Sequence, residues 1–341
     1  MLNNLTEPPS LGTGTLSEHR PPFPRFGCKK NMLNLFERNI ATVEQRLVLV
    51  APPHATVPDL FTRVAVDSVR HKRLVREMQA VRGDVYLHGG YLTPEQLTAG
   101  GLHQIPEDDK SWHLLMTDAK GQVSSCAWYL EHENTASIGN LRVRNCPLAR
   151  AGEWKDKFYA AVELEITQAR RDGLRYAEVG GWAVSKERRC SSEGLMLALA
   201  VYGLCRALGG ALGITTANVT HASSSILRRL GGSYLEAGGA TLPAYFDAKY
   251  NTMIELLRFD SRRPSLKYGF LVDLLQSRLA KVPVIVRPQG MWQPRQVQFE
   301  RSIVGPLVAA SAPTRHGAVE QSGPCRWLST MRPRSVATSD G

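Results

Sequence analysis

One stretch of the sequence combines a lone carboxylate, a short basic loop and the start of an apolar helix. Glu178 lies within an alternating strand pattern, Tyr176–Val184, and Arg188 and Arg189 follow that strand. The apolar run Gly194–Leu208 then predicts a helix. The first N–H groups of a helix have no intrahelical partner, and the helix dipole adds roughly half a positive charge there. The junction is therefore expected to bind an anion such as a phosphate.

The composition of the chain indicates how large a core can position this junction and what charge its partner carries. The chain has 341 residues, of which 43% are hydrophobic and 21% charged, and this is enough for one sizeable core with tails. A net charge of +11 and a pI near 9.5 favour an anionic partner. Nucleic acid, an anionic membrane, a phosphorylated cofactor and an acidic carrier protein all satisfy that charge, which alone does not choose among them.

The six cysteines are scattered, with no CxxC pair and no Cys/His cluster at zinc spacing. We expect structural thiols and no metal site. The first thirty residues lack the apolar core of a signal peptide, and no apolar run reaches the length of a membrane span. A cytoplasmic protein is therefore expected.

The clearest secondary structure is a hairpin over Ser111–His132, in which Asp118–Gly121 is the turn between two alternating runs. Further strands are expected at Gln45–Val50, Ala136–Val143, Tyr176–Val184, Leu212–Val219, Ser233–Glu236 and Asn251–Phe259. Helices are expected at Val64–Val81, Glu153–Arg171, Gly194–Leu208, Ala222–Leu230 and Leu266–Leu279. This order predicts an α+β (mixed α/β) fold with a central, twisted, mostly antiparallel sheet flanked by helices. It disfavours a Rossmann or TIM fold.

The ends of the chain differ from this core in composition. Residues 1–43 are rich in Pro, Gly, Ser and Thr, and we expect a disordered leader before a folded domain at 44–260. An amphipathic C-terminal helix is expected within 261–282; it either packs on the core or forms a flap beside a lipid-sized pocket. A disordered basic tail is expected at 283–341.

The helix-entry loop and the order of elements resemble the GNAT superfamily of acyl-CoA-dependent N-acyltransferases. The family signature, Arg/Gln-x-x-Gly-x-Gly/Ala, matches Arg189–Gly194, with Ser192 at the first glycine position. The resemblance implies that backbone amides of this loop bind the donor's pyrophosphate, and that the basic loop pairs with donor phosphates or with an acidic carrier protein. The implied donor-binding residues are Ala183, Val184, Arg188, Arg189, Ser191, Ser192, Glu193 and Gly194.

A narrower resemblance covers about Gln45–Asp260. The run Arg82–Tyr86, the following Gly90–Leu92, the hairpin and Ala177–Val179 are similar to long-chain N-acyl amino acid synthases and autoinducer (acyl-homoserine lactone) synthases. This resemblance implies transfer of an acyl chain from acyl carrier protein or acyl-CoA to the amine of a small metabolite such as an amino acid. Those families usually carry arginines at the positions that Gly181 and Trp128 occupy here.

The implied chemistry is attack of an amine on a thioester, which needs a base for the amine and donors for the oxyanion. Glu178 is the base candidate, and the amides near Ala183 and Val184 are the oxyanion donors. Many GNAT members place a tyrosine acid where this chain has Leu227, so Tyr234 or water is the expected acid. His113 and His221 are more simply structural.

Two alternatives remain open at this level. One is an ordinary acetyl-CoA-dependent N-acetyltransferase. The other is a catalytically silent acyl-binding or nucleic-acid-binding relative, because Ser192, Gly181 and Leu227 depart from the family pattern. The sequence lacks the interleaved aromatic and basic residues of a single-strand platform, so nucleic acid is not the expected partner.

Overall fold

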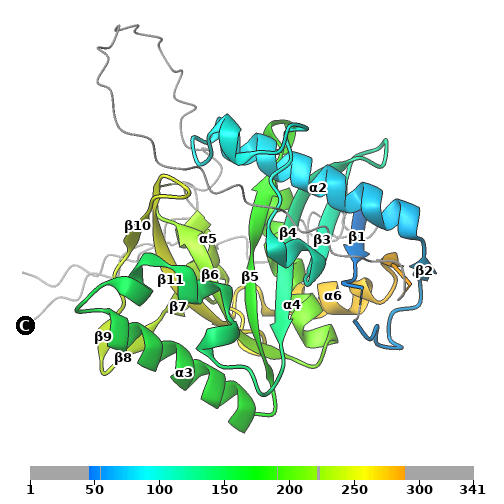
Figure 1. Cartoon of the computed structure of the whole chain (residues 1–341). Coiled ribbons are helices and arrows are strands. Elements are labelled where there is room, and N and C mark those ends of the chain that lie inside the picture. Colours follow the sequence, from blue (N-terminus) through cyan, green and yellow to red (C-terminus); the bar gives the residue numbers. More distant parts are fainter. Residues whose placement is uncertain (1–45, 54, 190, 221–222, 289–341) are drawn as a thin grey trace, which may run out of the picture. The chain divides into compact units, whose positions relative to one another are not determined.

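A computed structural model describes residues 46–53, 55–189, 191–220 and 223–288 (Figure 1). Within these residues, ten strands form one mixed sheet in the order β10-β11-β6-β5-β4-β3-β1-β12-β2, with β7 paired to β11. Neighbours are parallel at β5/β6, β1/β12 and β12/β2, and antiparallel elsewhere. The predicted mixed α/β fold with a mostly antiparallel sheet is confirmed. The leader and the tail beyond residue 288 lie outside the described residues.

The strands have the following bounds: β1 Leu47–Val50, β2 Val64–Val66, β3 Trp112–Thr117, β4 Val123–His132, β5 Arg175–Val184, β6 Ala211–Asn218, β7 Ser233–Tyr234, β8 Glu236–Ala237, β9 Ala240–Thr241, β10 Tyr245–Asp247, β11 Thr252–Asp260 and β12 Val284–Val286. The helices are α2 Ser68–His88, α3 Lys155–Arg171, α4 Glu193–Ala207, α5 Ser223–Leu230 and α6 Gly269–Leu279. Short 3-10 helices are η1 Pro94–Gln96, η2 Pro106–Asp109, η3 Ile138–Asn140, η4 Arg142–Asn145, η5 Pro147–Arg150 and η6 Lys186–Arg188.

The side-chain alternation of β4 separates the two faces of the sheet. Cys126 belongs to a buried cluster with Leu74 and Met78 of α2, whereas Tyr129, three residues on, lies near Cys205 of α4. Successive side chains of a strand point to opposite faces, so α2 and α4 cover opposite sides. On the face covered by α2, α3 packs over β5 and β6 through a second buried cluster that includes Phe158, Val162 and Ile166.

The helix predicted at Val64–Val81 is wrong at both ends. Val64–Val66 is the edge strand β2, and α2 begins only after Asp67, whose carboxylate accepts a hydrogen bond from the Arg70 amide as an N-cap. The helix continues through Gly83 to His88. Gly83 is a site of close approach: a Cβ there would lie 2.5 Å from the Gly101 carbonyl oxygen. The glycine is thus required for packing and does not end the helix.

The strand predicted at Ala136–Val143 is also wrong. The segment forms η3 and the start of η4, and the third antiparallel partner in the hairpin region is β5, which pairs with β4. The Glu178 carboxylate accepts hydrogen bonds from the amides of Arg142 and Val143. This side-chain acceptor replaces a strand partner, and an isolated sequence window does not show it.

The C-terminal segment belongs to the core further than expected. α6 packs against α4, burying Leu271, Val272 and Leu275. Of the two roles expected for this helix, it therefore has packing on the core. The disordered tail predicted from residue 283 begins too early, because β12 lies between β1 and β2 and its Val284 and Ile285 are fully buried. Among the described residues, no helix combines the length and the apolar run needed to cross a bilayer.

Candidate functional site

Strands β5 and β6 separate halfway along their length. Their parallel pairing runs from Arg175/Ala211 to Val179/Thr215 and stops there, while β5 continues beside β4 and β6 beside β11. A bulge in β5 causes the change of course: Trp128 pairs with Gly180 but Cys126 pairs with Ala183. The extra residue is accommodated by Gly181 at φ +63°, a conformation suited to glycine. The edges of two central strands therefore open into a gap.

The indole of Trp128 lies directly on this glycine pair. A Cβ on Gly180 would lie 2.4 Å from the Trp128 ring, and a Cβ on Gly181 would lie 2.3 Å from it. Both distances are impossible for real side chains without movement of the ring. Trp128 and Gly181 are thus one packing unit, because the bulky tryptophan requires the bare backbone.

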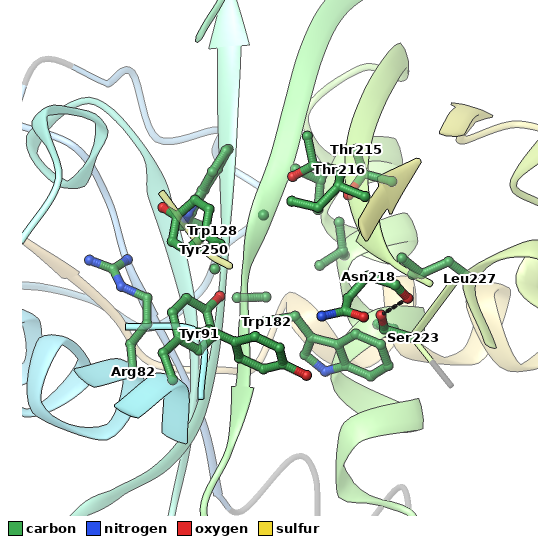
Figure 2. Close-up of a pocket in the computed structure, with 18 of the residues that line it drawn as sticks. Arg82, Tyr91, Trp128, Trp182, Thr215, Thr216, Asn218, Ser223, Leu227 and Tyr250 are labelled. Carbon is green, nitrogen blue, oxygen red and sulfur yellow. Dashed lines mark hydrogen bonds between the residues drawn. The ribbon is translucent and has the colours of Figure 1, made fainter. Parts of the chain in front are cut away.

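A cavity of about 280 Å³ occupies the gap between β5 and β6 and reaches both faces of the sheet. Side chains from β5, α4, α5 and β11 make one side mainly apolar: Trp182, Ala198, Val201, Tyr202, Leu227 and Phe259. The other side carries polar and aromatic groups from α2 and the neighbouring loops: Arg82, Tyr86, Tyr91, His103, Arg142 and Tyr250. Figure 2 shows Arg82, Tyr91, Trp128 and Tyr250 across the cavity from Thr215, Thr216, Asn218 and Leu227.

A buried ionic network supports the polar side. Arg82 is fully buried and forms a bidentate pair with Asp108, at 2.9 Å from Nη1 to Oδ1 and 2.7 Å from Nη2 to Oδ2. Its Nε donates to His103 Nδ1 at 3.0 Å, and its Nη2 also donates to the His103 carbonyl. Burial and the neighbouring Arg82 charge lower the pKa of His103 to about 3. The imidazole is therefore neutral, with Nδ1 as an acceptor.

Arg142 is the second guanidinium of the cavity, and it makes fewer hydrogen bonds than Arg82. Its Nη2 donates to the Tyr250 hydroxyl at 3.2 Å, its guanidinium carbon lies 5.9 Å from the centre of the Trp128 ring, and its Nε is 3.8 Å from the Glu107 carboxylate. Arg142 also borders a second, polar cavity of about 540 Å³, which Glu107 and His132 help to line. The side chain thus forms a wall common to both cavities.

Glu178 does not line the cavity between β5 and β6. Its side chain is buried and accepts three hydrogen bonds, from the amides of Arg142 (2.7 Å) and Val143 (2.8 Å) and from Nε2 of His132 (3.0 Å). It fixes the backbone from which the Arg142 side chain extends. His132 in turn borders the polar cavity. The catalytic role of Glu178 stays a prediction, and the geometry favours positioning of Arg142.

The predicted donor loop lies beside the cavity, outside its wall. Gly194 packs against β5: a Cβ there would lie 3.2 Å from Val184 and 3.3 Å from Trp182. The Ser191 hydroxyl accepts a hydrogen bond from the Glu193 amide, whereas Ser192 makes no side-chain cap. The loop enters α4 as expected, with Ser191 as the residue that caps.

Glu193 secures that loop to the sheet. Its carboxylate pairs with Arg46 at 2.9 Å and accepts hydrogen bonds from Ser124 (2.7 Å) and Ser125 (2.9 Å) at the start of β4. Of the basic residues, Arg188 is 3.9 Å from Glu193, and Arg189 is exposed at the end of η6. Phosphate binding by these residues stays a prediction.

The predicted acid, Tyr234, lies outside the cavity wall, in β7, where its ring stacks 5.0 Å from the guanidinium carbon of Arg228. Leu227, in contrast, lines the cavity. His113 is buried and its Nε2 bonds to the Asp108 carbonyl oxygen, which fits the structural role expected for it. His221 lies outside the described residues. Among those that are described, no cluster of His, Cys, Asp and Glu is placed to hold a metal ion.

Sequence reasoning missed Arg142, His132 and Tyr250 as site residues. Arg142 was placed on a strand, His132 ended a hairpin pattern, and Tyr250 is 108 residues from its partner Arg142. Arg142 and His132 are polar residues next to apolar strand or loop segments, and this is only a weak local indication of a site. Tyr250 had none, because its position depends on a contact far away in the sequence.

No family model matches the chain, and no curated protein matches it. Among solved structures, it is similar to a CoA-dependent acyl-homoserine lactone synthase, BjaI, with SAM and isopentyl-CoA: 16% identity over 73% of this chain and 95% of that one, TM-score 0.42. It is also similar to FeeM, an N-acyl amino acid synthase from uncultured soil microbes: 12% identity over 66% and 98%, TM-score 0.39. These are the kinds of protein that the sequence resembles.

Proposed function

We propose that this chain is an N-acyltransferase that moves a long acyl chain from a thioester, on acyl carrier protein or CoA, to the amine of a small metabolite such as an amino acid. The observation that carries the proposal is a cavity through the opening between β5 and β6, with apolar and polar sides. An acyl chain would lie on the apolar side, and an amine would approach from the polar side.

The chemistry needs few protein groups. The amine nitrogen attacks the thioester carbonyl and a tetrahedral intermediate forms. The C–S bond then breaks, the nitrogen gives up a proton and the departing thiolate takes up a proton, so the products are the amide and the free thiol. The backbone of Ala183 and Val184, beyond the last residue of β5 paired with β6, is proposed to stabilise the oxyanion. The start of α4, with Arg188 and Arg189 beside it, is proposed to receive the donor's phosphates. We place the reaction in the cytoplasm.

The apolar side favours a long donor over acetyl. Ala198 and Val201 of α4 border the cavity, and Phe259 closes its far wall against Tyr202, with ring centres 6.0 Å apart. An acetyl group would leave this apolar surface uncovered. Each methylene of the acyl chain that is buried against this surface contributes about 0.8 kcal/mol to binding. The affinity for the donor therefore rises with each added methylene.

A donor series tests this function. Thiol release and product mass are measured with a panel of amino acids and with acetyl, hexanoyl, decanoyl and palmitoyl thioesters of CoA and of acyl carrier protein. We expect kcat/KM to rise with chain length. Ala198→Phe fills the apolar side and is expected to lower kcat/KM for the long donors by on the order of 100-fold while sparing acetyl transfer.

Ala160→Phe, at an exposed position on α3, is the matched control and should behave as the unsubstituted protein. Transfer of acetyl alone would contradict the long-chain proposal. Absence of transfer from every donor, together with salt-sensitive binding to single-stranded nucleic acid, would instead support the silent relative.

A further inference from the structure

The two guanidinium groups that border the cavity differ in how many of their N–H groups already donate a hydrogen bond within the protein. Arg82 uses four of its hydrogen-bond donors on Asp108 and His103 and is fully buried. Arg142 makes one side-chain hydrogen bond within the described residues, to Tyr250. Its nearest carboxylate, Glu107, is at 3.8 Å, beyond hydrogen-bond distance. Arg142 therefore has N–H groups to offer an incoming anion.

The position of that guanidinium is fixed from three directions. Glu178 holds the Arg142 amide at 2.7 Å, Tyr250 holds one end of the guanidinium, and the Trp128 ring supports it at 5.9 Å. An arginine held in this way loses little further freedom when it binds a planar anion through two parallel hydrogen bonds. Trp128 is only 3% exposed and the Arg142 side chain is 23% exposed, so the guanidinium is partly shielded from water.

Access to this group comes from outside the acyl-binding side. Arg142 also borders the polar cavity together with Glu107, Lys110 and His132. An anion in that polar cavity lies beside Arg142, which also borders the cavity between β5 and β6. A zwitterion can leave its anionic end on Arg142 and extend its amine toward the opening of the strands.

We propose that Arg142 binds the carboxylate of the acceptor, so that the acceptor is an amine that carries a carboxylate, as an amino acid does, and that Arg142 determines this specificity. The inference rests on the proposed acyl transfer and assigns its acceptor selectivity to one side chain. Trp128 and Tyr250 act as positioning residues for that guanidinium.

The test compares free α-amino acids with their carboxamides, using leucine, phenylalanine, tyrosine, glycine and serine and the donor selected by the series above. The amide keeps the amine and removes the negative charge. A charged hydrogen bond of this kind predicts a kcat/KM about 10- to 100-fold higher for the acid than for the amide. In Arg142→Gln we expect the acid to lose that advantage, chiefly through KM, while the amide is used as before.

Arg142→Lys keeps the charge but loses the planar guanidinium. Its preference for the acid over the amide should therefore lie between that of the unsubstituted protein and that of Arg142→Gln. Arg150→Gln removes an exposed arginine of η5 and should retain the preference. Equal use of acid and amide by the unsubstituted protein, or equal losses on both in Arg142→Gln with an unchanged melting temperature, would overturn the proposal.

Calorimetric binding of the same acids and amides to the full chain without donor separates this inference from the acyl-transfer function. Binding of the acids that is lost in Arg142→Gln, in a chain that consumes no thioester, would remove the transfer function and keep the anion site. Thioester turnover without any preference for acids would do the reverse.

Discussion

Replacing Asp108 with alanine is expected to lower the free energy of unfolding by about 3–5 kcal/mol, because the change strands the buried Arg82 charge. Arg82 is fully buried and Asp108 is 5% exposed, so water cannot replace the lost carboxylate. Asp108 also accepts hydrogen bonds from Gln79 (2.9 Å) and the Ile105 amide (3.2 Å). Its loss therefore removes the partner that holds Arg82 on the polar side of the cavity.

Urea unfolding, followed by circular dichroism, measures this effect as a shift of the midpoint. Asp109→Ala is the matched control, since Asp109 is the exposed neighbour in the same short helix η2. The control should change stability by less than about 0.5 kcal/mol. A midpoint of Asp108→Ala close to that of the control would show that the pair does not hold the site together.

The same network makes stability sensitive to acid. Burial and the Arg82 charge lower the pKa of His103 from 6.5 to about 3. Between pH 6.5 and about pH 3, His103 is therefore protonated in the unfolded chain and neutral in the folded chain. The contribution of His103 is therefore fully present above pH 6.5 and is lost as the pH falls toward 3. Burial lowers the pKa of His71 and His113 as well, and both act in the same direction.

Asp108 adds to the acid sensitivity at lower pH. Burial alone raises the pKa of its carboxyl group, but Arg82 outweighs burial, and the net pKa lies below its ordinary value of 3.8. Its contribution is present above that value and disappears as the pH falls through the folded pKa. Unfolding midpoints between about pH 7 and pH 4 should fall steadily, and His103→Gln should reduce the slope. An unchanged slope in His103→Gln would contradict the assignment.

Replacing Glu178 with glutamine is expected to lower kcat/KM by about 100-fold while leaving donor binding unchanged. The carboxylate accepts three hydrogen bonds and donates none. A glutamine must present its NH₂ group to at least one of those donors. Two hydrogen-bond donors then face each other and one buried donor loses its acceptor, which costs about 1–3 kcal/mol. The backbone of Arg142 is displaced, and any proton transfer that involves Glu178 is lost.

The pH profile and the acceptor KM separate the two roles. Loss of the acidic limb of the kcat/KM profile would identify Glu178 as the base, whereas a raised acceptor KM with an unchanged profile would identify it as a positioning residue. Glu133→Gln, in the exposed segment after β4, is the control. Turnover equal to that of the unsubstituted protein would remove Glu178 from both roles, and donor affinity is followed by calorimetry with a non-transferable thioester analogue.

Local patterns were sufficient for the elements whose periodicity is strong. The hairpin around Asp118–Gly121, the amphipathic α3, and the succession of β5, loop and α4 all appear where their residues predict them. Each depends on contacts within a few turns or strand residues, so the sequence window contains the relevant information. The failures, at Val64–Val81 and Ala136–Val143, lie where Gly101 or Glu178 acts from a distant part of the chain.

The sequence by itself determined the succession of strand, loop and helix at the start of α4 and the mixed sheet around it, since helix starts and strand alternation are local properties. Only the tertiary structure decided what the candidate residues do. It turned Glu178 away from the cavity toward two amides and a histidine, placed Trp128 over Gly181, and brought Arg142 to Tyr250. Those outcomes depend on which strand pairs with which and on a bulge in β5, and both are set by packing between residues far apart in the sequence.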